Sequence, residues 1–167
     1  WLGNTNLILS IIKLIEDKMN LEHDIQEAGV QMILLVEDSI RFYSSILPNL
    51  YNYILEQSKN FSKEALNRHA ATMRMRGRPK VVLARTYEEA LKLYDKYSDN
   101  TLGVISDARF PLKNAAKAFG TLTETLPKPK HRTDTFGREK DPEAGLKLFR
   151  YIRKNDPFVP LILESSE

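Results

Sequence analysis

Four short apolar segments alternate along this chain with longer segments of helical periodicity, and this alternation limits the fold more than any other feature. Val104 and Ile105, for example, are β-branched and lie between turn-forming residues, as in a buried parallel strand. Strands that alternate with helices form a parallel sheet with helices on both faces. We therefore predict an α/β fold, a three-layer doubly wound parallel sheet with strands at 31–36, 81–84, 103–107 and 160–166.

Two helices are predicted before the second strand. Leucines and isoleucines recur at helical spacing over 5–19, and the polar residues 21–29 are predicted to be a linker. The first helix either packs on this domain's own core, or belongs to a preceding domain, or contacts a second copy. The second helix is predicted to start near Ile40, to be kinked by Pro48 and to end at Gly77, with up to about 36 residues and a length of about 54 Å. Its distal end is basic, which is typical of a solvated face, a dimerisation arm or a site for an anionic partner: Lys63, Arg68, Arg74, Arg76, Arg78 and Lys80.

The two remaining helices begin at recognisable caps. Thr86 is followed three positions later by Glu89, which is a capping-box pattern. Asp141 is a good N-cap, and Pro142 suits the first helical position. Residues 112–140 precede this cap, lack periodicity and contain several Lys and Arg residues, so they are predicted to be a mobile insertion.

Composition excludes several classes of protein. The 167 residues are enough for one hydrophobic core, and the chain has no cysteine for disulfides or thiol chemistry. A net charge of +3 does not by itself imply a nucleic-acid partner, and neither a membrane span nor a signal peptide is evident, so a cytoplasmic protein is expected. The three histidines, His23, His69 and His131, are too scattered for a metal cluster or a catalytic triad. The chain begins at Trp1 rather than Met, so we expect a piece of a longer protein.

Polar side chains follow three of the four predicted strands. Glu37 and Asp38 follow the first strand, Asp107 ends the third, and Ser165 lies at the end of the fourth. Ligands of open α/β sheets bind at the carboxyl ends of the strands, next to a switch in strand order. Three carboxylates brought together there would repel one another, and Mg²⁺ is the usual counter-ion. Such a site favours phosphoryl chemistry, in which Asp107 could be the nucleophile and Ser165 could donate a hydrogen bond to the phosphoryl group.

Four segments carry a resemblance to a known family: 33–39, 104–111, 141–145 and 160–166. In their order and spacing they resemble the receiver domain of bacterial two-component response regulators, which has a flavodoxin-like fold. The resemblance covers 31–167, apart from the insertion and the distal part of the long helix, and leaves 1–30 as an N-terminal helix and linker. The chain also resembles, more distantly, receiver segments fused to phosphoenolpyruvate-synthase-like modules.

The resemblance implies a role for each site residue. Asp107 would be the phospho-acceptor, and Glu37 and Asp38 would bind Mg²⁺ together with Asp107 and the backbone carbonyl of Arg109. Ser165 would be the switch hydroxyl that turns toward the phosphoryl group. The partner would be a histidine kinase or a phosphotransfer protein, and the domain would be a signalling switch rather than an enzyme.

The chain departs from this family in several places. The lysine that follows the family's fifth strand has no counterpart here, and neither do the fourth helix, the fifth strand and the fifth helix. Ser166 stands where the family prefers a smaller residue. The domain is therefore expected to be incomplete at its C-terminus.

Two alternatives remain open. One is a degenerate receiver that acts through protein contacts or dimerisation, by way of the N-terminal helix or the long helix, without phosphorylation. The other is a haloacid-dehalogenase-like phosphohydrolase that uses Asp107 as nucleophile. Such enzymes usually carry a second Asp two positions later, where this chain has Arg109.

Overall fold

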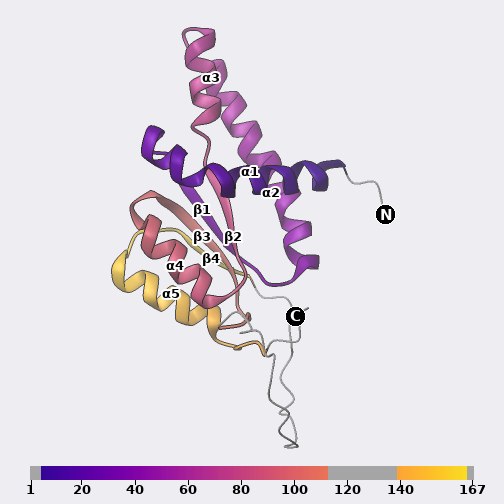
Figure 1. The fold of residues 1–167 in the computed structure, drawn as a ribbon, viewed down its shortest axis with the longest axis vertical. Helices are drawn as coiled ribbons and strands as arrows, with labels where there is room; N and C mark the ends of the chain where they lie inside the picture. The colour runs from indigo at the N-terminus through magenta and orange to yellow at the C-terminus, as the bar shows by residue number, and fades with distance from the viewer. Residues whose placement is uncertain (1–4, 113–138, 165–167) are drawn as a thin grey trace, which may run out of the picture.

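The structure is a computed structural model, and it describes residues 5–112 and 139–164. Its centre is a parallel sheet with the strand order β2-β1-β3-β4 (Figure 1). The predicted α/β class with a parallel sheet is thus confirmed. The strands are β1 (Met32–Val36), β2 (Lys80–Ala84), β3 (Thr101–Asp107) and β4 (Leu161–Glu164).

Hydrophobic packing on both faces of the sheet explains why β1 is apolar throughout. Alternate residues of a strand point to opposite faces, so a strand that is covered on both sides has no polar position. On one face Leu34 packs with residues of α4 (Tyr87–Tyr97) and α5 (Ala144–Asn155). On the other face Leu35 packs with residues of α2 (Ile40–Lys63).

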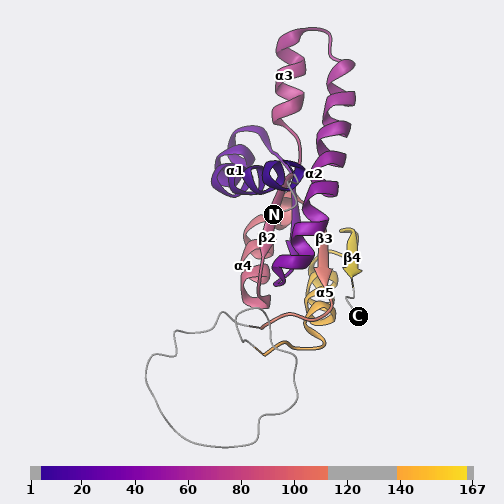
Figure 2. The ribbon, with the colours of Figure 1, turned by 90° about the vertical axis from the view of Figure 1, so that its right-hand side faces the viewer.

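The predicted long helix is wrong as a single element. The chain forms α2 and then α3 (Arg68–Arg76), with a break at 64–67. The side chain of Asn67 accepts a hydrogen bond of 2.8 Å from the backbone N–H of Ala70 and so caps the start of α3. Pro48 lies inside α2 and is buried. α2 and α3 form a hairpin that projects beyond the sheet, at the end opposite to the carboxyl ends of the strands (Figures 1 and 2).

The predicted linker at 21–29 is also wrong, because the first helix, α1 (Thr5–Ala28), includes almost all of it. Leu21 is buried and Ile25, one helical turn later, packs against the same core. These two apolar side chains attach the otherwise polar stretch to the fold. The helix ends at Gly29, whose φ of 59° is in the left-handed region that favours glycine. α1 contacts α2 and β2, so among the three alternatives the structure shows packing on this domain's own core.

The predicted caps have different outcomes. Thr86 caps α4 as predicted, since its side chain accepts a hydrogen bond from the backbone N–H of Glu89. Asp141 is not the N-cap of α5, which starts three residues later at Ala144. Its carboxylate instead accepts a hydrogen bond of 2.8 Å from the backbone N–H of Glu143, within a turn that leads into the helix. A 3-10 turn, η1 (Ser98–Asn100), joins α4 to β3.

Within 5–112 and 139–164, no helix combines the length and the apolar character that a bilayer span requires.

Candidate metal centre

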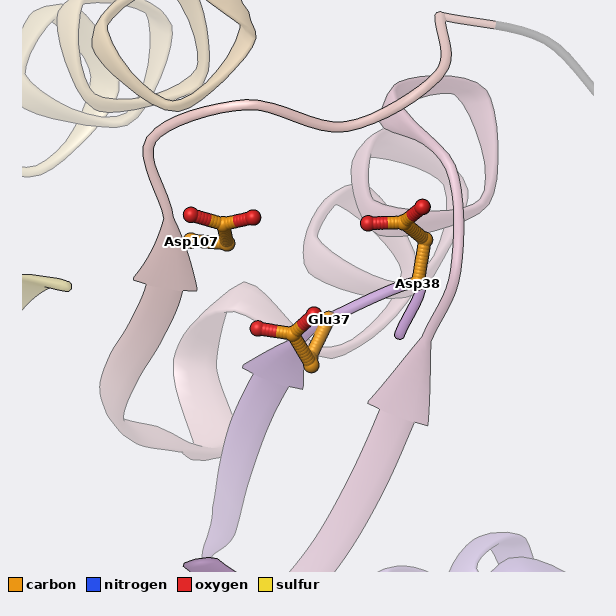
Figure 3. Close-up of side chains that lie close together, drawn as sticks. All are labelled: Glu37, Asp38 and Asp107. Carbon is orange, nitrogen blue, oxygen red and sulfur yellow. The ribbon is translucent and has the colours of Figure 1, made fainter. Parts of the chain in front are cut away.

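Three carboxylates lie together at the carboxyl ends of two neighbouring strands. Glu37 and Asp38 follow β1, and Asp107 is the last residue of β3. β1 and β3 are paired so that Val36 lies beside Ser106, which brings the next residues of both strands to one place. An oxygen atom from each of the three carboxylates lies within 4.8 Å of the other two (Figure 3). We call Glu37, Asp38 and Asp107 the acidic cluster.

The local backbone holds these residues at the edge of the sheet. The N–H of Glu37 donates a hydrogen bond of 3.0 Å to the carbonyl of Ala84, which continues the β1–β2 pairing by one residue. The N–H of Ser39 donates a hydrogen bond of 2.9 Å to Oε1 of Glu37 as the chain turns into α2. The Glu37 side chain is therefore fixed by the turn that ends its own strand.

The acidic cluster is buried, and burial is costly for charged groups. Glu37, Asp38 and Asp107 are only 3%, 0% and 4% exposed. Burial raises the pKa of Glu37 from 4.5 to about 7, the Ser39 N–H opposes this shift, and the neighbouring Asp107 and Asp38 raise the pKa further. Burial also raises the pKa of Asp107, although the N–H groups of Arg109 and Ala108 favour its charged form.

The two oxygens of Asp38 have different surroundings. Oδ1 accepts a hydrogen bond of 2.8 Å from Nζ of Lys140. Oδ2 is buried and has no hydrogen-bond partner within the described part of the chain. A buried carboxylate oxygen without a partner is unfavourable, and a bound cation would provide the missing interaction.

The donor set fits a hard divalent cation. Mg²⁺ prefers oxygen ligands. It is usually bound through one or two carboxylates and the phosphate oxygens of a substrate, and it keeps several water ligands. A divalent charge would also favour the ionised forms of Glu37 and Asp107, whose pKa values burial raises. The acidic cluster could therefore hold a metal ion. The sequence predicted a Mg²⁺ site here, and the identity of the ion stays a prediction.

The structure brings together some of the predicted site residues but not all of them. Glu37, Asp38 and Asp107 converge as expected. Arg109 lies in the turn after β3, and its N–H donates a hydrogen bond to Asp107, while its backbone carbonyl as a metal ligand stays a prediction. Ser165 lies outside the described residues.

Sequence reasoning missed Lys140. This residue lies at the end of the predicted insertion, immediately before the turn formed by Asp141. The sequence shows seven Lys and Arg residues in 112–140, and residue type does not distinguish the one that returns to the sheet edge. Its position directly before the recognisable Asp141-Pro142 turn was the only available signal, because that turn fixes where the chain rejoins the fold.

Comparisons with models of known protein families, with curated proteins and with solved structures found no match to this chain.

Proposed function

We propose that this chain is a receiver domain with a flavodoxin-like fold, a Mg²⁺-dependent switch that accepts a phosphoryl group on Asp107. The single observation that supports this most is the buried acidic cluster at the ends of β1 and β3. The strand order β2-β1-β3-β4 reverses between these two strands, and this reversal is where α/β sheets bind ligands.

The proposed chemistry follows from the position of each group. An oxygen of Asp107 attacks the phosphorus of a phosphohistidine donor, the bond from phosphorus to nitrogen breaks, and imidazole leaves. Burial raises the pKa of Asp107, and the N–H groups of Arg109 and Ala108 oppose this shift by favouring the ionised, nucleophilic form of its carboxylate. A bound Mg²⁺ would supply charge to neutralise the phosphoryl oxygens. By the family resemblance, Ser165 would donate a hydrogen bond to the bound phosphoryl group.

Fluoroberyllate, an analogue of a phosphoryl group, tests this proposal. We expect the protein to bind fluoroberyllate in the presence of Mg²⁺, observed as protein-bound fluorine signals in ¹⁹F NMR, and to lose this binding in Asp107→Asn. Asp99→Asn is the matched control, because Asp99 is exposed and lies just before the other end of β3. Absence of bound fluoroberyllate, or its retention in Asp107→Asn, would contradict the proposal.

A second candidate function, as a dimerisation module, is supported by the outer face of α1. Ile8, Ile12, Ile15 and Met19 are 41%, 50%, 54% and 78% exposed. Their spacing of four, three and four residues is that of a coiled-coil seam. In an antiparallel pair with a second copy, Ile12 would face Ile15 and Ile8 would face Met19, so this face is complementary to itself. The proposed occupant is therefore α1 of a second copy.

The oligomeric state in solution tests this second candidate. We expect a dimer by light scattering coupled to size-exclusion chromatography, and a monomer for Ile12→Asp and for Ile15→Asp. Met73→Asp is the control, since Met73 is 49% exposed on α3 and lies outside the seam. A monomeric parent protein would contradict the candidate, and it would do so without affecting the proposal for Asp107.

A further inference from the structure

Lys140 is the one described cation that forms an ion pair with the acidic cluster. Its Nζ lies 2.8 Å from Oδ1 of Asp38, and its side chain is only 17% exposed. Asp38 itself is fully buried, so this contact is shielded from solvent much better than a surface ion pair is.

The backbone around Lys140 fixes its position relative to the site. The next residue, Asp141, forms an antiparallel bridge with Phe110, and its N–H donates a hydrogen bond of 3.2 Å to the Phe110 carbonyl. The carboxylate of Asp141 pairs with Lys147 of α5 at 2.6 Å. Phe110 is fully buried and follows Asp107 by three residues, so the contact of Lys140 with Asp38 rests on a packed part of the fold.

The charge of Lys140 acts on the whole cluster. Besides its contact with Asp38, its positive charge lowers the pKa of both Glu37 and Asp107, against the larger effect of burial. Three ionised carboxylates and one ammonium carry a net charge of about −2, which is the charge that one divalent cation balances. Lys140 therefore leaves room for one divalent cation and disfavours a second.

We propose that Lys140 sets the affinity of the acidic cluster for a divalent cation by competing with it for Asp38. The ammonium already occupies Oδ1, while Oδ2 is open to a ligand. A divalent cation on Asp38 would lie close to the ammonium, and two positive charges at such a distance repel strongly in a buried site. Metal binding must therefore either displace Lys140 from Asp38 or act against its charge.

This inference rests on one part of the proposed function, the metal site at the acidic cluster, and does not depend on phosphorylation of Asp107.

Titration with Mn²⁺ tests the inference. Mn²⁺ shares the preference of Mg²⁺ for oxygen ligands, and electron paramagnetic resonance measures the concentration of free Mn²⁺ directly. We expect Lys140→Gln to bind Mn²⁺ about tenfold more tightly than the parent, and Lys140→Arg, which keeps the charge, to bind it as the parent does. Lys96→Gln is the control: Lys96 lies in the last turn of α4 and pairs with Glu22 of α1 at 3.1 Å, and its loss should leave Mn²⁺ affinity unchanged.

Thermal unfolding gives a second readout that a merely structural lysine would not reproduce. In EDTA, Lys140→Gln should unfold at a lower temperature than the parent, because the buried carboxylates lose their only paired cation among the described residues. In Mn²⁺ this difference should disappear or reverse. A structural lysine would instead lower the unfolding temperature equally with and without metal.

Each outcome decides between the inference and the proposed function. Equal or weaker Mn²⁺ binding by Lys140→Gln would overturn the role of Lys140 and leave the metal site standing. Binding by Lys140→Gln alone would support the role of Lys140 and count against metal-dependent phosphorylation in this form of the protein. Absence of Mn²⁺ binding by all variants would overturn both.

Discussion

Arg78 and Asp17 are 61 positions apart in the chain and form a buried ion pair with two hydrogen bonds, of 2.6 Å from Nη2 to Oδ1 and 3.1 Å from Nη1 to Oδ2. Asp17 also accepts hydrogen bonds of 2.9 Å from the hydroxyl of Tyr51 and from the backbone N–H of Val81. Asp17 lies on α1, Tyr51 on α2 and Val81 in β2, and Arg78 lies just before β2. Asp17 thus joins the first helix to the rest of the fold, so α1 packs as part of this domain.

Replacing Asp17 by Ala should strongly destabilise the protein. The change leaves a buried guanidinium, a tyrosine hydroxyl and a backbone N–H without their acceptor, and breaking a buried ion pair from one side costs about 3–5 kcal/mol. The free energy of unfolding in urea measures this loss. Glu16→Ala is the control: it removes an exposed pair with Lys13 on the same helix, which is worth less than about 1 kcal/mol. Equal stability of the two variants would mean that α1 is not part of the cooperative fold.

Stability of the metal-free protein should depend on pH through Glu37. The pKa of Glu37 is raised to about 7 in the folded protein, compared with 4.5 in the unfolded chain. Between these values the folded protein holds a proton that the unfolded chain has released. The contribution of Glu37 to stability is therefore fully present below about pH 4.5 and is lost as the pH rises through about 7.

Unfolding temperatures in EDTA and in Mg²⁺ across this pH range test that dependence. We expect the increase caused by Mg²⁺ to be small near about pH 5 and larger near about pH 8, where the ionised carboxylates need a counter-charge. Glu37→Gln does not titrate and should have a flatter profile in EDTA. A profile in EDTA that is the same for Glu37→Gln and the parent would show that another group causes the dependence.

Removing the charge of Asp107 should stabilise the metal-free protein. Asp107 is buried beside two other carboxylates, and an Asn oxygen can still accept hydrogen bonds from the N–H groups of Ala108 and Arg109. We expect Asp107→Asn to raise the unfolding temperature in EDTA by about 2–8 °C, and to reduce the further increase caused by Mg²⁺. Asp99→Asn, at an exposed position, should change neither value. A less stable Asp107→Asn protein would mean that the charge is structural.

The sequence was sufficient to predict the parallel sheet and the three residues of the acidic cluster, because these depend on local patterns. A strand buried on both faces must be continuously apolar, as Leu34, Leu35 and Val36 are, and parallel strands necessarily end at one edge. The residues that follow such strands therefore converge whatever the details of packing. The same reasoning predicted the cap of α4 from Thr86 and Glu89.

The features that the sequence did not reveal depend on contacts between distant segments. Asp17 is one acidic residue in a helix with several, and only the position of Arg78 explains why it is buried. Asn67 caps α3 after the break, and Asn is favoured in turns as well as at caps. Lys140 lies 102 positions from Asp38, with an unpatterned stretch between them. None of these pairs leaves a periodic signal in the sequence.

Gly145 links the packing of α5 to the position of Asp107. Its N–H donates a hydrogen bond of 3.1 Å to the carbonyl of Ala108, and an added Cβ would lie 2.5 Å from the carbonyl oxygen of Asp107 and 2.7 Å from Cδ1 of Leu163. The first of these atoms belongs to the backbone at the end of β3, so it cannot move without displacing the acidic cluster.

We therefore expect Gly145→Ala to lower the free energy of unfolding by about 1–3 kcal/mol, although Ala is the better helix former. The same change should weaken Mn²⁺ binding, because Asp107 must shift to relieve the contact. Gly77→Ala is the matched control: its Cβ would meet only the carbonyl of Met73 at 3.4 Å and that of Arg74 at 3.7 Å, which are ordinary contacts. A Gly145→Ala protein with the parent's stability but weaker Mn²⁺ binding would show that the end of β3 yields easily. One that matched the parent in both would show that α5 can move away from the site without disturbing it.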